Sequence, residues 1–581
     1  MRWSHPVSIT SIAAAVWLIA SVVLTFIAGE FTGGITLVVG SIVVYFILAF
    51  TLRTDSAHDF YVAGRSIPAF VNGAATGAAW MSAASYISLA GVIALLGYDA
   101  MPFIIGWTLG FTLMAFTIAP FVRKSNTYTI PELLEKRAGG WGPVRSLAVI
   151  IIFLMYITYL TAQYVGIGVI FSRFLGLPAT IAVFIGVFGS LAYIWISGWK
   201  GITWIQFLQF FVMITMYSAP VFVAAYYLEI LPLPHLLYGD LIDQIQVKEA
   251  SFGLPLWTEP FTKTVGGGRG PVNWMFFALV LMLGTMGLPH ILIRFYTVKS
   301  VNTARLSVGW ALLCISLLYT TATVYATIAR HHFSNLWGEP IREVMNTPWI
   351  EKWSPTGLIK IVDRNSDGIL QPHELIFHSD IVVVGMPDMF GMFWLIAPFV
   401  AVGGLAAALS TADGLLLTMS TAVARDVYSR FVNPRATDAS EIAIIRILFI
   451  VVGFIGASLA YLALSDPKFA AYVVLLVGWA FVIAASTFTP VIILSIFWKR
   501  LNRYGMLAGM IAGLLISLPY IVMVGILKMP PIEFIGNSIG TISWGILGFL
   551  GNIIIAIIMS SLTKKEGIDV DRFVDSMRLP D

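Results

Sequence analysis

A short acidic segment, DRNSDGILQPHE, has the spacing of a calcium-binding loop. It matches the pattern D-x-[DN]-x-[DN]-G-x5-E at every fixed position, and Gly368 permits the sharp turn of such a loop. The ligands that the pattern predicts are the side chains of Asp363, Asn365, Asp367 and Glu374 and the backbone carbonyl of Ile369. We expect a helix on each side, in TGLIKIV and in PHELIFHSDIVVV. The alternative is an acidic loop that matches by chance, because the sequence has no second loop to pair with it.

A second set of polar residues lies within apolar sequence. Ser410, Thr411 and Asp413 occur in the segment 388–423, which otherwise consists mainly of small and apolar residues. An ionisable side chain within a membrane-spanning helix is costly unless it has a partner, and such residues commonly mark ion or substrate pathways. The segment 67–97 is also rich in Gly and Ala. Gly-interrupted helices in two parts of a bundle indicate a transporter site at the membrane midplane, although Gly and Ala also form simple packing seams.

The chain is too apolar for a soluble protein of its length. Of its 581 residues, 58% are hydrophobic and 11% are charged, and the mean hydropathy is +0.88. Apolar runs of about 20 residues, the length that crosses a hydrocarbon core, recur about fourteen times. They show no barrel-like alternation, so we predict an all-α polytopic protein embedded in the lipid bilayer. The expected spans are 8–28, 33–52, 67–97, 101–122, 146–175, 178–198, 202–228, 273–294, 304–328, 388–423, 441–465, 469–498, 504–527 and 539–562.

The short loops predict an orientation for these spans. If the spans alternate, the basic residues of the short loops share one side, which the positive-inside rule makes the cytoplasm. These residues are Arg53, Arg65, Arg123, Lys124, Lys136, Arg137, Arg145, Arg294, Lys299, Arg305, Arg425, Arg430, Arg435, Lys499, Arg500, Arg503, Lys564 and Lys565. Both termini are then cytoplasmic, and the segments 229–272 and 329–387 face outward. The acidic loop would hold a structural calcium ion there with a Kd of about 10⁻⁴–10⁻³ M.

Several functions are excluded by what the sequence lacks. The single cysteine, Cys314, lies in an apolar span, so no internal disulfide, cysteine metal site or thiol catalyst is expected. The net charge of +4 reflects the basic residues of the short loops, which set the orientation in the membrane. We therefore expect no nucleic-acid partner. No phosphate loop, kinase motif or H-E-x-x-H pattern occurs, which argues against an enzyme. The first span lacks an evident cleavage site and is expected to be retained.

Three motifs resemble the sodium/solute symporter family, which includes proline, sugar and monocarboxylate transporters. FYVAGRSIPAFVNGAATGAAWMSAASYISLAG looks like the first core helix with its F-x-x-A-G-R signature, and LGTMGLPHILIRFYTVKS is similar to the G-x-x-G-x-P-H-x-x-x-R-F run of the sixth. AALSTADGLLLTMSTAVARDVYSR resembles the eighth core helix and its D-[LIV]-Y ending. Order and spacing agree over roughly residues 33–500. The resemblance implies sodium-coupled symport and a leucine-transporter-type fold of five-plus-five inverted repeats.

The same resemblance implies how the chain is divided. The expected parts are two N-terminal helices and a cytoplasmic loop in 1–66, a ten-helix core in 67–500 that contains the extracytoplasmic loop 329–387, two C-terminal helices in 501–562, and a cytoplasmic tail in 563–581. A transporter-like sensor is an alternative function, but sensors of this kind carry a soluble signalling domain, and the tail here is short. The sequence leaves open the oligomeric state and whether a small membrane subunit accompanies the chain.

Carried over residue by residue, the family's principal sodium site falls on two helices. It consists of the backbone carbonyls of Ala78, Met81 and Ala407 and the hydroxyls of Ser410 and Thr411. Sodium is a small hard cation that accepts such oxygens, and a broken helix supplies carbonyls that have no internal hydrogen bond. The alternative is that the two hydroxyls bond back to carbonyls of their own helix and only bend it.

The sequence departs from its relatives at a second ion site. Some members have an Asp in the fifth core helix that binds a second sodium, and the aligned residue in GWKGITWIQFLQ is Gln206. A carboxylate occurs instead at Asp413, three residues after Ser410 and on nearly the same helix face. We therefore predict that Asp413 and Gln206 form a second cation or proton site. The alternative is a structural Asp held by nearby hydroxyls or a helix end.

The substrate is less well specified. The third core helix presents Tyr156, Tyr159, Gln163 and Tyr164, and relatives line the substrate pocket from this helix, although tyrosines at this spacing are more often core residues. We expect no Arg or Lys at mid-depth, so an anionic substrate would depend on helix N-termini, hydroxyls and the bound sodium. The chain most resembles bacterial members near the acetate and monocarboxylate permeases. This favours a short monocarboxylate such as acetate, then an amino acid such as proline, carried across a bacterial inner membrane.

Overall fold

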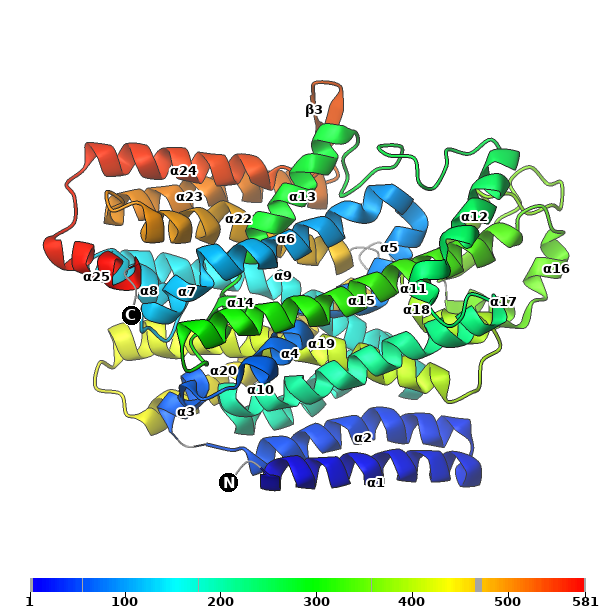
Figure 1. The fold of residues 1–581 in the computed structure, drawn as a ribbon, viewed down its shortest axis with the longest axis horizontal. Coiled ribbons are helices and arrows are strands. Elements are labelled where there is room, and N and C mark those ends of the chain that lie inside the picture. The colour runs from blue at the N-terminus through cyan, green and yellow to red at the C-terminus, as the bar shows by residue number, and fades with distance from the viewer. Residues whose placement is uncertain (1–3, 55, 176, 357, 466–472, 579–581) are drawn as a thin grey trace.

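Long helices that run roughly along one axis make up most of the molecule (Figure 1). The computed structural model describes residues 4–578 except 55, 176, 357 and 466–472. Within this part of the chain, ten helices are long and apolar enough to cross a membrane, or eleven if one bent pair counts as a span. The strands found there form two short antiparallel hairpins. The prediction of an all-α polytopic membrane protein is therefore confirmed.

The first half of the chain contains the N-terminal helix pair and the first part of the bundle. Its helices are α1 Ser4–Ala28, α2 Glu30–Thr51, α3 Ala57–Val62, η1 Ala63–Arg65, α4 Ala69–Trp80, η2 Ala84–Ser88, α5 Leu89–Leu96, η3 Gly97–Ala100, α6 Met101–Thr117, α7 Ala119–Lys124, α8 Ile130–Arg137, α9 Gly142–Leu175, α10 Ala179–Tyr227, α11 Pro234–Leu237, α12 Gly239–Ser251 and α13 Pro271–Met286.

The second half completes the bundle and adds the two hairpins. Its elements are α14 Pro289–Leu292, η4 Ile293–Phe295, α15 Val301–Asn335, α16 Ile341–Met345, α17 Pro348–Trp353, η5 Ser354–Thr356, β1 Ile359–Ile361, β2 Leu375–Phe377, α18 Ile381–Met389, α19 Ile396–Thr421, η6 Ala422–Val432, α20 Asp438–Ser465, α22 Val473–Phe497, α23 Arg503–Tyr520, η7 Ile521–Ile526, β3 Ile532–Phe534, β4 Asn537–Ile539, α24 Gly545–Leu562 and α25 Ile568–Arg578.

Merged and interrupted helices explain why ten spans are counted where the sequence predicts about fourteen. Two pairs of predicted segments each count as one span: 67–97 with 101–122 in Ala84–Thr117, and 178–198 with 202–228 in Ala179–Tyr227. The segment 273–294 is the bent pair, which is counted separately. The segment 8–28 contributes only the shorter helix Ala14–Ala28. The predicted span 469–498 begins outside the described residues, and α22 covers the rest of it.

Two helical segments are broken inside the bundle. One lies in the Gly- and Ala-rich segment 67–97, and the other is 273–294, which the sequence did not mark. The second marked segment, 388–423, is not interrupted in this way, because it contains the continuous helix α19. The helix α4 ends at Trp80, and the chain resumes as the π-helical turn η2 before α5. The helices α13 and α14 form the bent pair, with an angle of 46° between Pro271–Met286 and Pro289–Phe295. Broken helices place backbone carbonyls and helix ends at mid-bundle, where transporters bind ions and substrates.

The helix α10 changes course at a single glycine. It contains 49 residues, which would extend about 74 Å as a straight helix and so exceed a hydrocarbon core of about 30 Å more than twofold. Gly198 has φ 59° and ψ −173°, a conformation open to glycine, and a kink there separates the two predicted spans. The break agrees with the predicted gap between residues 198 and 202.

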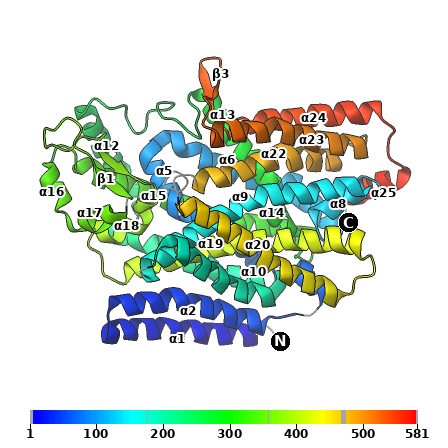
Figure 2. The same cartoon turned by 180° about the vertical axis from the view of Figure 1, so that it is seen from behind.

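The two ends of the bundle differ. Figures 1 and 2 show α8 and α25 at one end, with the start of α1 on the same side, and α12, α16 and α17 at the other. We call the end with α8 and α25 the basic end, and the end with α12, α16 and α17 the loop end. The start of α1 and the helix α25 thus lie toward one end, and the helices of the long loops lie at the other.

The helices predicted beside the acidic loop are wrong next to the loop itself, because only the end of PHELIFHSDIVVV, from Ile381, belongs to a helix, α18. The flanking segments form the antiparallel strands β1 and β2, in which Ile359 pairs with Phe377 and Ile361 with Leu375. The reason is that these segments are short and alternate between buried and exposed residues, a period of two that suits a strand. The Phe377 ring also packs against Phe333, with 4.2 Å between the ring centroids. The loop is therefore the tip of a hairpin.

Two predicted span boundaries also differ. The segment 388–423 begins at the end of α18, and the membrane helix α19 starts only at Ile396. The segment 539–562 begins in strand β4, and α24 starts at Gly545. Hydropathy alone did not separate these apolar turns and strands from the helices that follow them.

Candidate ion and substrate site

The break after α4 leaves two carbonyls without their usual backbone donors. The N–H of Ser82 donates to the Trp80 carbonyl at 2.8 Å, and the N–H of Ala83 donates to Gln163 Oε1 at 2.9 Å. In a continuous helix these two N–H groups would reach the carbonyls four residues earlier. The carbonyls of Ala78 and Ala79 are therefore available to other partners.

The helix α19 supplies those partners. Ser410 Oγ donates to the Ala78 carbonyl at 2.8 Å and to the Ala407 carbonyl at 2.9 Å. Thr411 Oγ1 donates to the Ala79 carbonyl at 2.8 Å. All five residues are fully buried. The alternative in which both hydroxyls bond only to their own helix is wrong, because each reaches across to α4.

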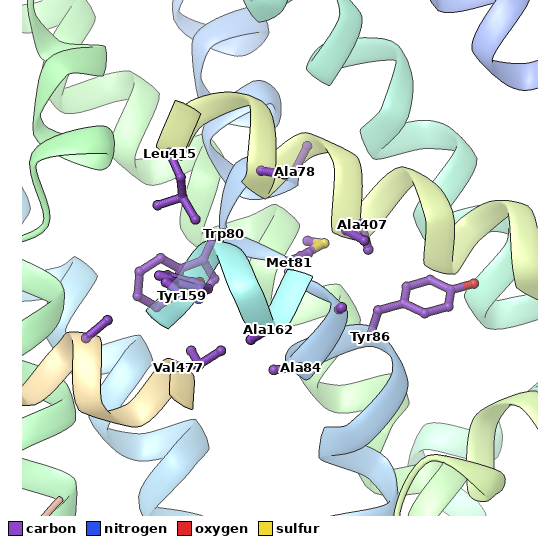
Figure 3. Close-up of a cluster of buried hydrophobic side chains, with 14 of the residues drawn as sticks. Ala78, Trp80, Met81, Ala84, Tyr86, Tyr159, Ala162, Ala407, Leu415 and Val477 are labelled. Carbon is purple, nitrogen blue, oxygen red and sulfur yellow. The ribbon is translucent and has the colours of Figure 1, made fainter. Parts of the chain in front are cut away.

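Met81 lies at the break itself. Its φ and ψ of −72° and 72° end the helical run, and Figure 3 shows it close to Ala78 and Ala407, where α4 passes α19. The five residues of the predicted sodium site are thus brought to one place. Ala79 was not predicted, and its position next to Ala78 is the signal that could have identified it. Carbonyl and hydroxyl oxygens of this kind can bind a sodium ion.

The predicted second site is arranged differently from the expectation. The Tyr193 hydroxyl lies 2.9 and 2.8 Å from the two carboxylate oxygens of Asp413. Gln206 instead donates from Nε2 to the Ser410 carbonyl at 2.6 Å. All four side chains are fully buried. Asp413 and Gln206 are therefore linked through the Ser410 turn.

The loop position expected for Arg294 is wrong. Arg294, which the sequence places in a cytoplasmic loop, is fully buried. Its Nη2 donates to Gln206 Oε1, its Nη1 donates to Thr203 Oγ1 at 3.4 Å, and its guanidinium lies 5.0 Å from the centre of the Trp199 ring. The bend between α13 and α14 explains the error, because residues after the bend stay inside the bundle.

The predicted substrate residues lie on two sides of α9. The Tyr156 hydroxyl lies 2.8 Å from His290 Nδ1 and accepts the His290 backbone N–H at 2.8 Å. The Tyr159 ring lies 6.0 Å from the His290 ring, between centroids. The Tyr164 ring instead lies against Gly456 of α20. Tyr156 and Tyr159 therefore face the bent pair, while Tyr164 faces α20.

His290 and Gln163 each have one free donor position. Gln163 Nε2 and His290 Nε2 are buried and have no hydrogen-bond partner among the described residues. Sequence reasoning missed His290, although the motif GLPHILIR placed it at a helix break. These two nitrogen atoms share this property with other buried atoms such as the Tyr164 hydroxyl oxygen, and both are available to hydrogen-bond a polar ligand.

The basic end of the site is closed by buried ion pairs. Arg145 contacts Glu135 at 2.6 Å and Asp426 at 2.5 Å, and the side chains of all three are at most 7% exposed. Arg430 adds a second contact to Glu135 at 2.9 Å. These pairs join α8, α9 and η6. The path from the ion site to this end would have to separate them before it opens.

The acidic loop folds around its own carboxylates. Asp367 accepts the N–H of Ile369 at 2.8 Å, and Glu374 accepts the N–H of Arg364 at 2.7 Å. These backbone donors hold the pKa of both carboxyls below the usual range, so both are ionised at neutral pH. In the described part of the chain, no three Asp, Glu, His or Cys side chains are grouped closely enough to hold a metal ion. Calcium binding therefore remains a prediction.

The broken helices, the buried oxygen cluster and the apolar bundle define a sodium-coupled secondary transporter. Residues 60–345 and 374–513 match the model of the Sodium:solute symporter family, and the chain belongs to this family. It is a transporter and not an enzyme.

Relatives agree with this assignment. An uncharacterized symporter of Cupriavidus necator is 31% identical over 93% of this chain and 92% of its own length. An uncharacterized symporter of Bacillus subtilis is 29% identical over 90% of this chain and 92% of its own. A solved Na⁺-coupled sialic acid symporter, in a substrate-bound outward-open state, is 15% identical with a TM-score of 0.67 and covers 92% of this chain and 98% of that one. This likeness confirms the leucine-transporter-type fold.

Proposed function

We propose that the protein couples the entry of a short monocarboxylate, such as acetate, to sodium that binds between α4 and α19. The observation that carries the ion site is the pair of carbonyls freed at the α4 break, which the hydroxyls of Ser410 and Thr411 reach at 2.8 Å. Sodium bound there accepts lone pairs from Ala78, Met81, Ala407, Ser410 and Thr411, after the two hydroxyl protons turn away. The ion then ties the broken helix to α19, which is how its binding is coupled to closure around the substrate.

Two free donors support a carboxylate substrate, one beside the α4 break and one at the bent pair. Gln163 Nε2 and His290 Nε2 offer neutral hydrogen-bond donors, and the Tyr156 hydroxyl lies between α9 and His290. Neutral donors suit a small anion whose charge is balanced by the sodium ion that enters with it. A sodium-coupled amino-acid symporter is the second candidate, because the same donors would accept an amino-acid carboxylate.

A flux experiment tests both proposals. The protein is reconstituted into proteoliposomes, and uptake of labelled acetate is followed under an inward sodium gradient. We expect uptake above the potassium control, and competition by other short monocarboxylates but not by proline. Stronger competition by proline would favour the amino-acid proposal. Absence of sodium-driven uptake for every acid and amino acid tested would contradict both.

The sidedness of the protein is part of the proposal. We place the basic end in the cytoplasm of a bacterial inner membrane, because the short basic loops gather there, and we place the acidic loop outside. External sodium would then reach the proposed site from the loop end.

We also propose that the acidic loop binds calcium. Glu374 accepts backbone N–H groups of Arg364 and Gln371, and it would have to turn from them toward the ion. We expect millimolar calcium to raise the melting temperature of the purified protein by about 2 °C, because a ligand at about tenfold its Kd stabilises the folded state by about 1.4 kcal/mol.

The matched controls for this prediction are two charge-neutralised variants. Glu374→Gln should lose the calcium response, whereas Glu351→Gln, an exposed acid outside the loop, should keep it. Equal melting temperatures with calcium and with a chelator in the unaltered protein would contradict calcium binding.

A further inference from the structure

Two opposite charges are buried beside the proposed sodium site. Asp413 and Arg294 are both fully buried, and Gln206 bridges the guanidinium to the carbonyl of Ser410, three residues before Asp413. Among the described residues, no carboxylate lies within ion-pair distance of Arg294, and the near partners of Asp413 are hydroxyls. A buried charge without a counter-charge is strongly unfavourable, so each of these groups is the neutralising partner of the other.

A relay of hydrogen bonds connects the guanidinium to the ion site. Arg294 Nη2 donates to Gln206 Oε1, and Gln206 Nε2 donates to the Ser410 carbonyl at 2.6 Å. Asp413 follows Ser410 by about one helical turn. The Gln206 amide and the guanidinium thus bring positive charge to the part of α19 from which Asp413 projects.

The guanidinium is held in this place from several sides. It stacks on Trp199 at 5.0 Å and donates to Thr203, both on α10. The backbone carbonyl of Arg294 accepts from Asn72 Nδ2, on α4, at 3.3 Å. An arginine fixed to both α10 and α4 is a permanent charge in the structure, in contrast to an ion that enters and leaves.

We propose that Arg294 is a built-in cation that neutralises Asp413 in place of a second coupling sodium, so that the transporter binds a single sodium ion. The inference rests on the proposed sodium site and concerns its stoichiometry. The charges of the Asp413 carboxylate and the Arg294 guanidinium sum to zero. One bound sodium ion therefore gives the region a net charge of +1. A second sodium would add another positive charge to a dry interior, at a cost of several kcal/mol.

Sodium binding to the purified protein tests this inference without knowledge of the substrate. Radiolabelled sodium is counted per protein molecule, and its half-saturating concentration is measured. We expect one sodium in the unaltered protein, with a Hill coefficient of about 1. Asp413→Asn leaves the guanidinium uncompensated, so it should raise the half-saturating sodium concentration by about tenfold or more.

The reverse variant should change the number of ions. Arg294→Gln leaves the carboxylate without its counter-charge, and we expect it to recruit a second sodium, with a Hill coefficient that rises above 1. The double variant removes both charges and should bind one sodium, with a half-saturating concentration within about threefold of the unaltered protein. Arg294→Lys keeps the charge, and Arg305→Gln changes an exposed arginine, so both should bind one sodium.

The outcomes separate this inference from the proposed function. Two sodium ions in the unaltered protein would overturn the inference and leave the sodium site intact. A double variant that binds sodium no better than Asp413→Asn would also overturn it, even if Arg294→Gln does not fold. No sodium binding to the unaltered protein would overturn both.

Discussion

Loss of both hydroxyls in Ser410→Ala with Thr411→Ala is expected to abolish sodium-driven uptake while the protein still folds and inserts. Each hydroxyl reaches a carbonyl of α4 at 2.8 Å, so each is placed to contact an ion held by the same carbonyls. A hydrogen bond to a charged group contributes about 1.5–3 kcal/mol, and we take an ion contact to be of similar size. Each single variant should therefore raise the half-saturating sodium concentration by about ten- to a hundredfold.

The measurement is sodium-dependent uptake in proteoliposomes, at sodium concentrations that reach saturation for the unaltered protein. Thr418→Ala is the matched control, because the Thr418 hydroxyl donates to the Gly414 carbonyl of its own helix at 2.7 Å and does not reach α4. It should change the sodium dependence by less than about threefold. If both single variants keep the sodium dependence of the unaltered protein, sodium binds elsewhere.

The sequence predicted the contacts at the proposed ion site better than those around it. The Gly- and Ala-rich segment 67–97 predicted a helix interrupted at mid-bundle, and α4 does end at Trp80. The family motifs then placed Ala78 opposite Ser410, residues 332 positions apart in the chain that the structure joins at 2.8 Å. The local Gly- and Ala-rich pattern was enough to predict the break after α4. The contact between α4 and α19 could be predicted only from the family resemblance.

Residues whose roles depend on a bend were not predictable in the same way. Counting apolar residues along 273–294 gives a straight span, and it puts Arg294 at the cytoplasmic end of that span, next to the short basic loop. The 46° bend between α13 and α14 keeps Arg294 inside and brings His290 to Tyr156. Neither contact has a signal in hydropathy, because both depend on packing between distant helices.

Gln163 illustrates the difference between a position and a role. The sequence predicts Gln163 as a substrate residue of α9, but its Oε1 accepts the Ala83 N–H and thereby stabilises the break. The Oε1 atom of Gln163 thus has a structural role, and only its Nε2 remains to hydrogen-bond a substrate. A substitution there would disturb the sodium carbonyls as well as the substrate donors.

The positions of the ion pairs and of the sodium site together indicate how access alternates. Arg145 joins Glu135 and Asp426 at the basic end, and Asp426 belongs to the turn η6 that directly continues α19. The helix that carries Ser410 and Thr411 therefore also carries part of the closure at the basic end. Ion binding that holds α19 against α4 would keep that end closed, and ion release would free both contacts.

Gly198→Ala is expected to prevent the protein from folding to a stable state. Gly198 has φ 59° and ψ −173°, which is strained for any residue with a side chain. A Cβ atom there would also lie 2.7 Å from Phe60 Cδ2 and 3.1 Å from Phe60 Cα. The backbone strain alone costs about 1–3 kcal/mol, and the clash with buried Phe60 adds to it. Since α10 holds Tyr193 before this kink and Gln206 beyond it, a shift there would also displace the partners of Asp413 and of the Ser410 carbonyl.

The measurement is the yield of monodisperse protein in detergent, followed by its melting temperature. Gly189→Ala is the matched control on the same helix, because a Cβ there would lie 3.5 Å from Ile42 Cδ1, an ordinary contact. Alanine is also the better helix former, by about 1 kcal/mol, so Gly189→Ala should fold at least as well as the unaltered protein. A Gly198→Ala variant with unaltered yield and melting temperature would mean that α10 does not require this kink, and the division of α10 into two spans would then be wrong.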